Sequence, residues 1–111
     1  MAFSRGDVIL VPFPFSDLST TKVRPAVVVS SEAYGANLPD LLLAAITSRV
    51  NRPGPFELHF TDWAEAGLRF PSALKPVIAT IDPGRVVHIV GRLSERDLEA
   101  VDATLRTALD L

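Results

Sequence analysis

The chain has 111 residues, of which 48% are hydrophobic and 22% charged, so it fits one globular domain over residues 1–111 and leaves no room for a second. It contains no cysteine, which excludes a disulfide framework and a thiolate zinc site and favours a reducing, cytoplasmic location. The net charge of −2 argues against a uniformly basic nucleic-acid binder.

The first predicted strand covers Asp7 to Phe15, a segment rich in residues that favour β-structure. Pro12 and Pro14 cannot donate hydrogen bonds to a neighbouring strand, so the second half of this strand should run along a sheet edge. The small polar residues from Ser16 to Val23 then predict an exposed loop.

A second strand begins near Arg24, where a continuous apolar pattern resumes and extends to Ser31. The segment from Tyr34 to Asp40 is predicted to be a loop. It leads into a third strand from Leu41 to Ser48, which is apolar along most of its length and is therefore predicted to be buried.

The second half of the chain predicts further short strands and turns. Phe56 to Phe60 alternates apolar and polar residues, as a half-buried strand does, and follows a turn at Pro53 to Pro55. Thr61 to Gly67 is interpreted as one helical turn. The remaining predicted elements are strands over 72–81 and 85–91, separated by a turn at 82–84.

The last segment predicts one amphipathic helix. Ser94 fits an N-cap, with acidic residues in the first turn, and Leu98, Val101, Leu105 and Ala108 fall on one helical stripe. Five or six short strands followed by one terminal helix favour a small antiparallel β-barrel or roll over a βαβ sheet.

The distribution of charge and hydropathy limits the possible partners. From Ser94 onward, five acids oppose two bases and give −3, so the preceding residues carry +1 and RNA binding is compatible with the charge. No apolar run approaches the roughly 20 residues that span a membrane, and the first residues lack a signal-peptide pattern. We therefore expect no membrane partner.

Several motifs of known enzyme classes are missing from the sequence. There is no glycine-rich phosphate loop, HExxH or GxSxG motif, and no cluster of histidines and carboxylates at metal-ligand spacing, so neither a metal nor a cofactor is expected. The two histidines, His59 and His88, are interpreted as structural positions on strands.

Arg24 and Thr47 are the candidate catalytic residues. Pro25 forces an extended conformation on Arg24, so its guanidinium leaves the start of a strand in a restricted direction. If the second and third strands pair as an antiparallel hairpin, the start of one lies beside the end of the other, and Arg24 lies close to Thr47. A guanidinium and a hydroxyl together make an anion site, which Ser48 and Arg49 extend.

The chain resembles the MazF/PemK family of toxin–antitoxin endoribonucleases. The matching segments follow the family's order over nearly the whole chain: Arg5–Val8, Arg24–Val29, Ala45–Arg49, Pro55–Glu57, Leu74–Pro76, Thr80–Asp82 and Gly91–Ser94.

This resemblance implies an SH3-like, CcdB/MazF-like barrel, a homodimer, and metal-independent, sequence-specific cleavage of single-stranded RNA that leaves a 2′,3′-cyclic phosphate and a 5′-hydroxyl. The family's catalytic arginine and threonine map onto Arg24 and Thr47. An antitoxin with an acidic, flexible tail would cover the same groove. Lys22, Ser48, Arg49 and Lys75 are candidates for contacts with RNA.

One segment departs from the family pattern. Many relatives carry a glycine-rich loop with Glu-Gln before the Arg-Pro pair, whereas residues 16–23 contain neither glycine nor glutamate, so the roles of that loop cannot be transferred. Two alternatives stay open: a CcdB-like toxin that binds DNA gyrase without cleaving RNA, and an inactive barrel that binds an antitoxin or nucleic acid.

Overall fold

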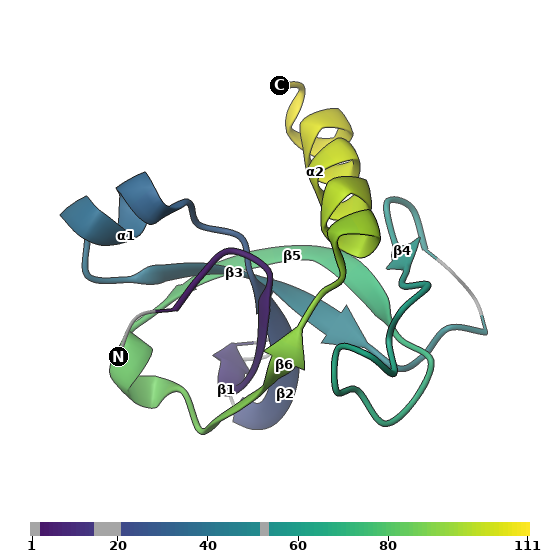
Figure 1. Ribbon diagram of the computed structural model, residues 1–111, viewed down its shortest axis with the longest axis horizontal. Coiled ribbons are helices and arrows are strands. Elements are labelled where there is room, and N and C mark those ends of the chain that lie inside the picture. The colour runs from purple at the N-terminus through teal and green to yellow at the C-terminus, as the bar shows by residue number, and fades with distance from the viewer. Residues whose placement is uncertain (1–2, 15–20, 52–53) are drawn as a thin grey trace.

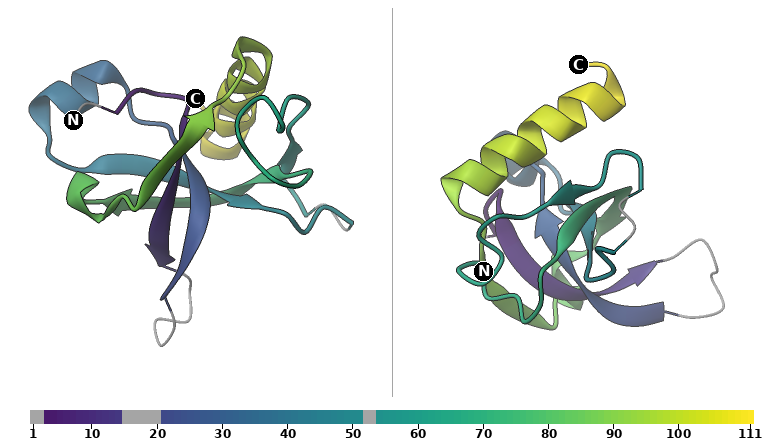
Figure 2. Two further views of the ribbon diagram at one scale, coloured as in Figure 1. Left: turned by 60° about the horizontal axis from the view of Figure 1, so that its bottom comes forward. Right: turned by 90° about the vertical axis from the view of Figure 1, so that its right-hand side faces the viewer.

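The computed structural model describes residues 3–14, 21–51 and 54–111. Within these ranges one curved sheet carries a long C-terminal helix on one side (Figures 1 and 2). The elements in chain order are β1 (Asp7–Pro14), β2 (Thr21–Val28), α1 (Glu32–Asn37), β3 (Leu41–Thr47), β4 (Leu58–His59), β5 (Ala73–Ile81), the 3-10 helix η1 (Pro83–Arg85), β6 (His88–Arg92) and α2 (Glu95–Leu109).

The six strands of the described residues lie in the order β4-β5-β3-β2-β1-β6, and each neighbouring pair is antiparallel. The predicted fold class, a small, mainly β, antiparallel barrel-like sheet with a C-terminal helix, is therefore confirmed, although the sheet is curled as a half-barrel. In the described part of the chain, β1 pairs with β2 as far as Pro14 but with β6 only as far as Leu10. This confirms the edge position predicted from the prolines.

Two apolar cores explain why the strands contain continuous apolar runs. Alternate side chains of a strand point to opposite faces of the sheet. In β3, Leu43 and Ala45 pack in the core under one face with Ile9 and Phe13, whereas Ala44 and Ile46 pack in the core under the other face. The second core also holds Val101 of α2, so the helix covers that face.

The C-terminal helix begins as predicted. Ser94 is its N-cap, and its hydroxyl accepts a hydrogen bond from the backbone N–H of Asp97 at 3.2 Å. Leu98, Val101 and Leu105 pack on the core, whereas Ala108 is exposed because the last turns extend beyond the sheet.

Four predicted elements differ from the structure. The predicted loop at 34–40 contains α1, because Ser31 caps a short helix by accepting from the N–H of Tyr34 at 3.1 Å. β2 begins at Thr21, three residues before the predicted start, because pairing with β1 extends it. The strand predicted over 56–60 is reduced to Leu58–His59, the part that pairs with β5.

The fourth difference is β6, which begins at His88 and not at residue 85, because Pro83–Arg85 form η1. The segment 61–67, interpreted as one helical turn, has a single i→i+4 hydrogen bond, from the N–H of Ala66 to the carbonyl of Asp62, within a run of turns. The predicted loop residues 16–20 and the Pro53 end of the predicted turn lie outside the described residues.

Candidate functional site

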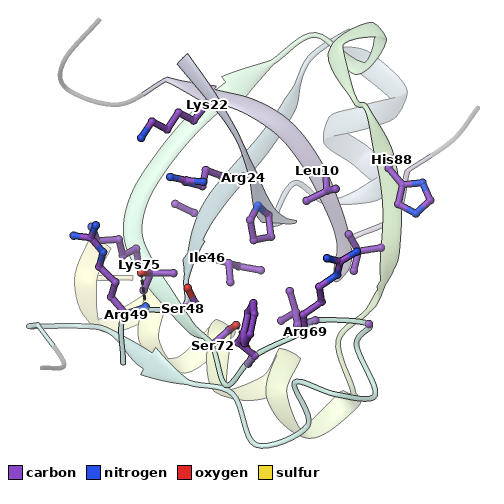
Figure 3. A pocket seen from close by; sticks show the side chains of 17 residues that line it. Leu10, Lys22, Arg24, Ile46, Ser48, Arg49, Arg69, Ser72, Lys75 and His88 are labelled. Atoms are coloured by element: carbon purple, nitrogen blue, oxygen red, sulfur yellow. Dashed lines mark hydrogen bonds between the residues drawn. The ribbon is translucent and has the colours of Figure 1, made fainter. Parts of the chain in front are cut away.

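A pocket of about 1010 Å³ opens on the concave side of the sheet. Its lining comes from β1, β2, β3, β5 and β6, together with the residues after β3 and the loop at 67–72 that precedes β5 (Figure 3). Strand ends and loops therefore supply most of its polar groups, while the strands behind them supply a rigid floor.

Arg24 and Thr47 both line this pocket. β2 and β3 pair with Ala26 opposite Ala45 and Val28 opposite Leu43. Arg24 and Thr47 therefore each lie two residues beyond the paired segment, at its same end. Arg24 is exposed in the first half of β2 and points into the pocket (Figure 3). The antiparallel pairing assumed for the two strands is thus observed, and it brings both residues to the same end of the pair.

The hydroxyl of Thr47 is oriented by its own backbone. Its Oγ1 accepts a hydrogen bond from the N–H of Arg49 at 3.1 Å. Because the oxygen is the acceptor in this bond, its hydrogen remains available for an acceptor in the pocket. Thr47 is half-buried, so a ligand oxygen bonded there would be partly shielded from water.

Positive charge dominates the pocket. In the described part of the chain, its lining contains Lys22, Arg24, Arg49, Arg69 and Lys75 but no aspartate or glutamate. The three salt bridges between described residues lie elsewhere, at Arg5–Asp102, Arg92–Asp7 and Arg96–Asp62. In a chain of net charge −2, this concentration of cations favours a polyanionic ligand.

All six residues singled out in the sequence line this pocket: Lys22, Arg24, Thr47, Ser48, Arg49 and Lys75. The sequence did not single out Arg69 and Phe70, which join the lining from a loop. His88 and His59 lie on strands, but both are exposed, and His88 reaches the pocket wall with its ring directed away from the centre (Figure 3). In the sequence, Arg69 and Phe70 carried no signal beyond their residue types.

The loop at 61–72 is held to the start of α2. The buried carboxylate of Asp97, 2% exposed, accepts hydrogen bonds from the N–H groups of Thr61 at 3.0 Å and Asp62 at 2.7 Å. The carboxylate of Asp62 in turn accepts from the guanidinium of Arg96 at 2.7 Å and the hydroxyl of Ser94 at 2.6 Å. The hydrogen bond from Arg96, followed by that from Ser94, lowers the pKa of Asp62 below its ordinary value.

The same loop touches the backbone of β6 at two glycines. A Cβ on Gly67, whose φ is +88°, would lie 2.4 Å from the carbonyl oxygen of Val90. A Cβ on Gly91 would lie 2.3 Å from the carbonyl oxygen of Ala66. Only glycine allows this approach, so the loop closes the gap between β6 and the β4–β5 edge.

The described residues contain no group of three or more histidine, aspartate or glutamate side chains that could hold a metal ion. Among the helices of the same part of the chain, none is long and apolar enough to cross a membrane.

The comparisons with known proteins agree with this architecture. A family model described as "PemK-like, MazF-like toxin of type II toxin-antitoxin system" matches residues 4–109. No curated protein sequence gives a significant match.

Three solved structures show the similarity of this chain to known folds. A mycobacterial endoribonuclease in complex with its cognate antitoxin has a TM-score of 0.76 at 17% identity, covering 99% of this chain and 95% of that one. The Mycobacterium tuberculosis toxin MazF-mt6 has a TM-score of 0.75 at 23% identity, covering 95% and 97%. The MazE–MazF structure (Form-III) from Deinococcus radiodurans has a TM-score of 0.77 at 19% identity, covering 100% and 99%. The likeness covers the whole fold.

Proposed function

The chain belongs to the PemK-like, MazF-like toxin family of type II toxin–antitoxin systems, and from this premise we propose that it is an endoribonuclease that cleaves single-stranded RNA. The observation that carries the proposal is a pocket whose described lining residues include five cations and no carboxylate, next to a strand-end hydroxyl. Similar structures that are endoribonucleases support it.

The reaction we propose is a metal-independent transesterification. The 2′-oxygen of one nucleotide forms a bond to the adjacent phosphorus, and the bond from phosphorus to the 5′-oxygen breaks. The proton lost from the 2′-hydroxyl is balanced by the proton gained at the leaving 5′-oxygen. The products are a 2′,3′-cyclic phosphate and a 5′-hydroxyl.

Arg24 and Thr47 are assigned roles that their chemistry allows. A guanidinium donates hydrogen bonds and has no acceptor site, so Arg24 stabilises the negative charge that develops on the non-bridging oxygens and does not remove the proton. Thr47 donates its hydroxyl hydrogen to the same phosphate. Lys22, Ser48, Arg49 and Lys75 hold the flanking phosphates of the strand.

The proposed protein partner follows from the positive charge of the pocket. A cognate antitoxin with an acidic, flexible tail would compete with RNA for the cations, and a similar toxin fold is known in complex with its antitoxin. We also infer a homodimer from the family resemblance. Light scattering at micromolar concentration should give twice the 12.0 kDa mass of the chain, and a 12.0 kDa species alone would contradict the dimer.

The experiment is cleavage of a mixed-sequence single-stranded RNA in EDTA by the wild type, Arg24→Ala and Thr47→Ala. We expect the wild type to cleave the RNA and Arg24→Ala to cleave it at least about a hundredfold more slowly, the scale of removing one hydrogen-bond donor to the transition state. Arg85→Ala is the control, because Arg85 is exposed but does not line the pocket. Equal activity of the wild type and Arg24→Ala would refute the site, and gyrase binding without RNA cleavage would favour the CcdB-like alternative.

A further inference from the structure

Phe70 is an apolar side chain in an unusual place. It is 63% exposed, more than any other aromatic residue of the described chain, and it lines the cation-rich pocket beside Arg69. A phenylalanine with this exposure has little part in the two cores, so packing in a core does not explain why an aromatic residue is found at this position. Its surroundings combine an aromatic ring with flanking positive charges.

We propose that Phe70 is a stacking platform for an unpaired nucleobase, with Arg69 bound to the adjoining phosphate. This site rests on the proposed ribonuclease function and deepens it, because it assigns the recognition of a base to a residue outside the catalytic pair. A single-stranded RNA exposes the faces of its bases, and a ring bordered by cations is the combination that binds such strands.

The backbone around Phe70 is held in place before any ligand binds. The hydroxyl of Ser72 donates a hydrogen bond to the carbonyl of Phe70 at 2.7 Å, and Pro71 between them restricts the backbone. Ser72 is itself buried, and its carbonyl accepts from the N–H of Phe60 at 3.0 Å. The C-terminal end of the loop is therefore tied to the sheet.

The N-terminal end of the loop is tied as firmly. Asp97 holds the backbone at Thr61 and Asp62, and Gly67 lies against the backbone of β6. A ring carried on a backbone fixed at both ends loses little conformational entropy when a base stacks on it. The loop is thus a preorganised part of the pocket wall.

An RNA base fits this position better than a polypeptide side chain. Among the described residues, the lining of the pocket supplies five cations and no carboxylate, so the ligand that brings an apolar face must also bring negative charge at short intervals. Each nucleotide of a single strand carries both a flat base and a phosphate. An acidic peptide carries the charge, but it has a flat apolar face only where an aromatic residue happens to occur.

The test is binding of a fluorescein-labelled, mixed-sequence 2′-fluoro RNA, which lacks the 2′-hydroxyl and cannot be cleaved by the proposed route. We expect Phe70→Leu, which keeps an apolar side chain but removes the aromatic face, to weaken binding about tenfold. Phe70→Trp should retain or improve the affinity. The matched control is Phe56→Leu, since Phe56 is 49% exposed but does not line the pocket.

A second probe separates the base from the backbone. An oligomer of the same length made of abasic nucleotides should bind the wild type and Phe70→Leu equally, because it has nothing to stack. Unchanged affinity of Phe70→Leu for the 2′-fluoro RNA, or equal weakening on both probes, overturns the stacking site.

Failure of the stacking site is distinguishable from failure of the proposed function. If natural RNA is cleaved in EDTA with Arg24 required, but Phe70→Leu binds as the wild type does, only the stacking site is lost. If natural RNA is bound with Phe70 required but is not cleaved, the nuclease function fails and the base site stands. The emission of Trp63, the single tryptophan, reports whether each variant keeps its loop.

Discussion

Replacing Asp97 by alanine should destabilise the protein and loosen the loop that carries Arg69 and Phe70. The carboxylate is 2% exposed and accepts from two backbone N–H groups, those of Thr61 and Asp62. A buried donor left without its partner costs about 1–3 kcal/mol, and the charge near the start of α2 adds about 0.3–1 kcal/mol. Water can reach the exposed side of Thr61, so we expect a total loss of about 2–4 kcal/mol.

This loss is measurable by urea unfolding followed through the fluorescence of Trp63, at one fixed protein concentration. Asp97→Asn retains an oxygen that can accept one of the two bonds, so its loss should be intermediate. Glu99→Ala is the control, because Glu99 is an exposed carboxylate two residues further along the same helix. If Asp97→Ala changes the free energy of unfolding no more than Glu99→Ala does, the hydrogen bonds do not hold the loop and the reasoning fails.

Three further predictions concern backbone, pH and salt. Gly67→Ala should lower the free energy of unfolding by about 2–4 kcal/mol in the same urea assay, because the added Cβ would meet the carbonyl of Val90. Gly35→Ala is the control, since a Cβ there would have nothing within 4 Å and should be neutral or stabilising. Similar effects of the two substitutions would refute the close approach of Gly67. Because Arg96 lowers the pKa of Asp62, the ion pair stabilises the fold above the ordinary pKa of 3.8 and is lost as the pH falls through the lowered value. Melting temperatures should therefore fall less steeply below pH 3.8 in Asp62→Asn than in the wild type, and parallel curves would contradict the linkage. Lys75→Gln should reduce the slope of log K against log salt for single-stranded RNA by about 0.7, and an unchanged slope would remove Lys75 from the phosphate contacts.

The candidate catalytic residues Arg24 and Thr47 were accessible from the sequence because both are placed by local rules. Pro25 restricts Arg24, and the apolar run that ends before Thr47 marks the end of a strand. The connection between the two strands leaves their register open in the sequence, and the observed register, with Ala26 opposite Ala45, brings Arg24 and Thr47 to the same end of the pair. Whether they catalyse cleavage is the subject of the proposed assay.

The errors in the predicted elements also have local causes. The segment predicted to be a loop includes Gly35 and Asn37, which are common in loops, but the cap from Ser31 is sufficient for the short helix α1. The start of β2 depended on its pairing with β1, which polar residues such as Thr21 and Lys22 do not reveal. Hydrogen bonding to a neighbouring strand overrides such weak local preferences.

Sequence alone determined the strands with strong apolar patterns, the N-cap at Ser94, the final helix and the positions of Arg24 and Thr47, since each depends on neighbours along the chain. Tertiary structure decided that Arg69 and Phe70 join the pocket. Their loop is held by Asp97, which bonds to Thr61 across 36 positions, and by the contact of Gly67 with β6. No local pattern encodes such long-range contacts, because they form only when the curled sheet brings its two edges and the start of α2 together.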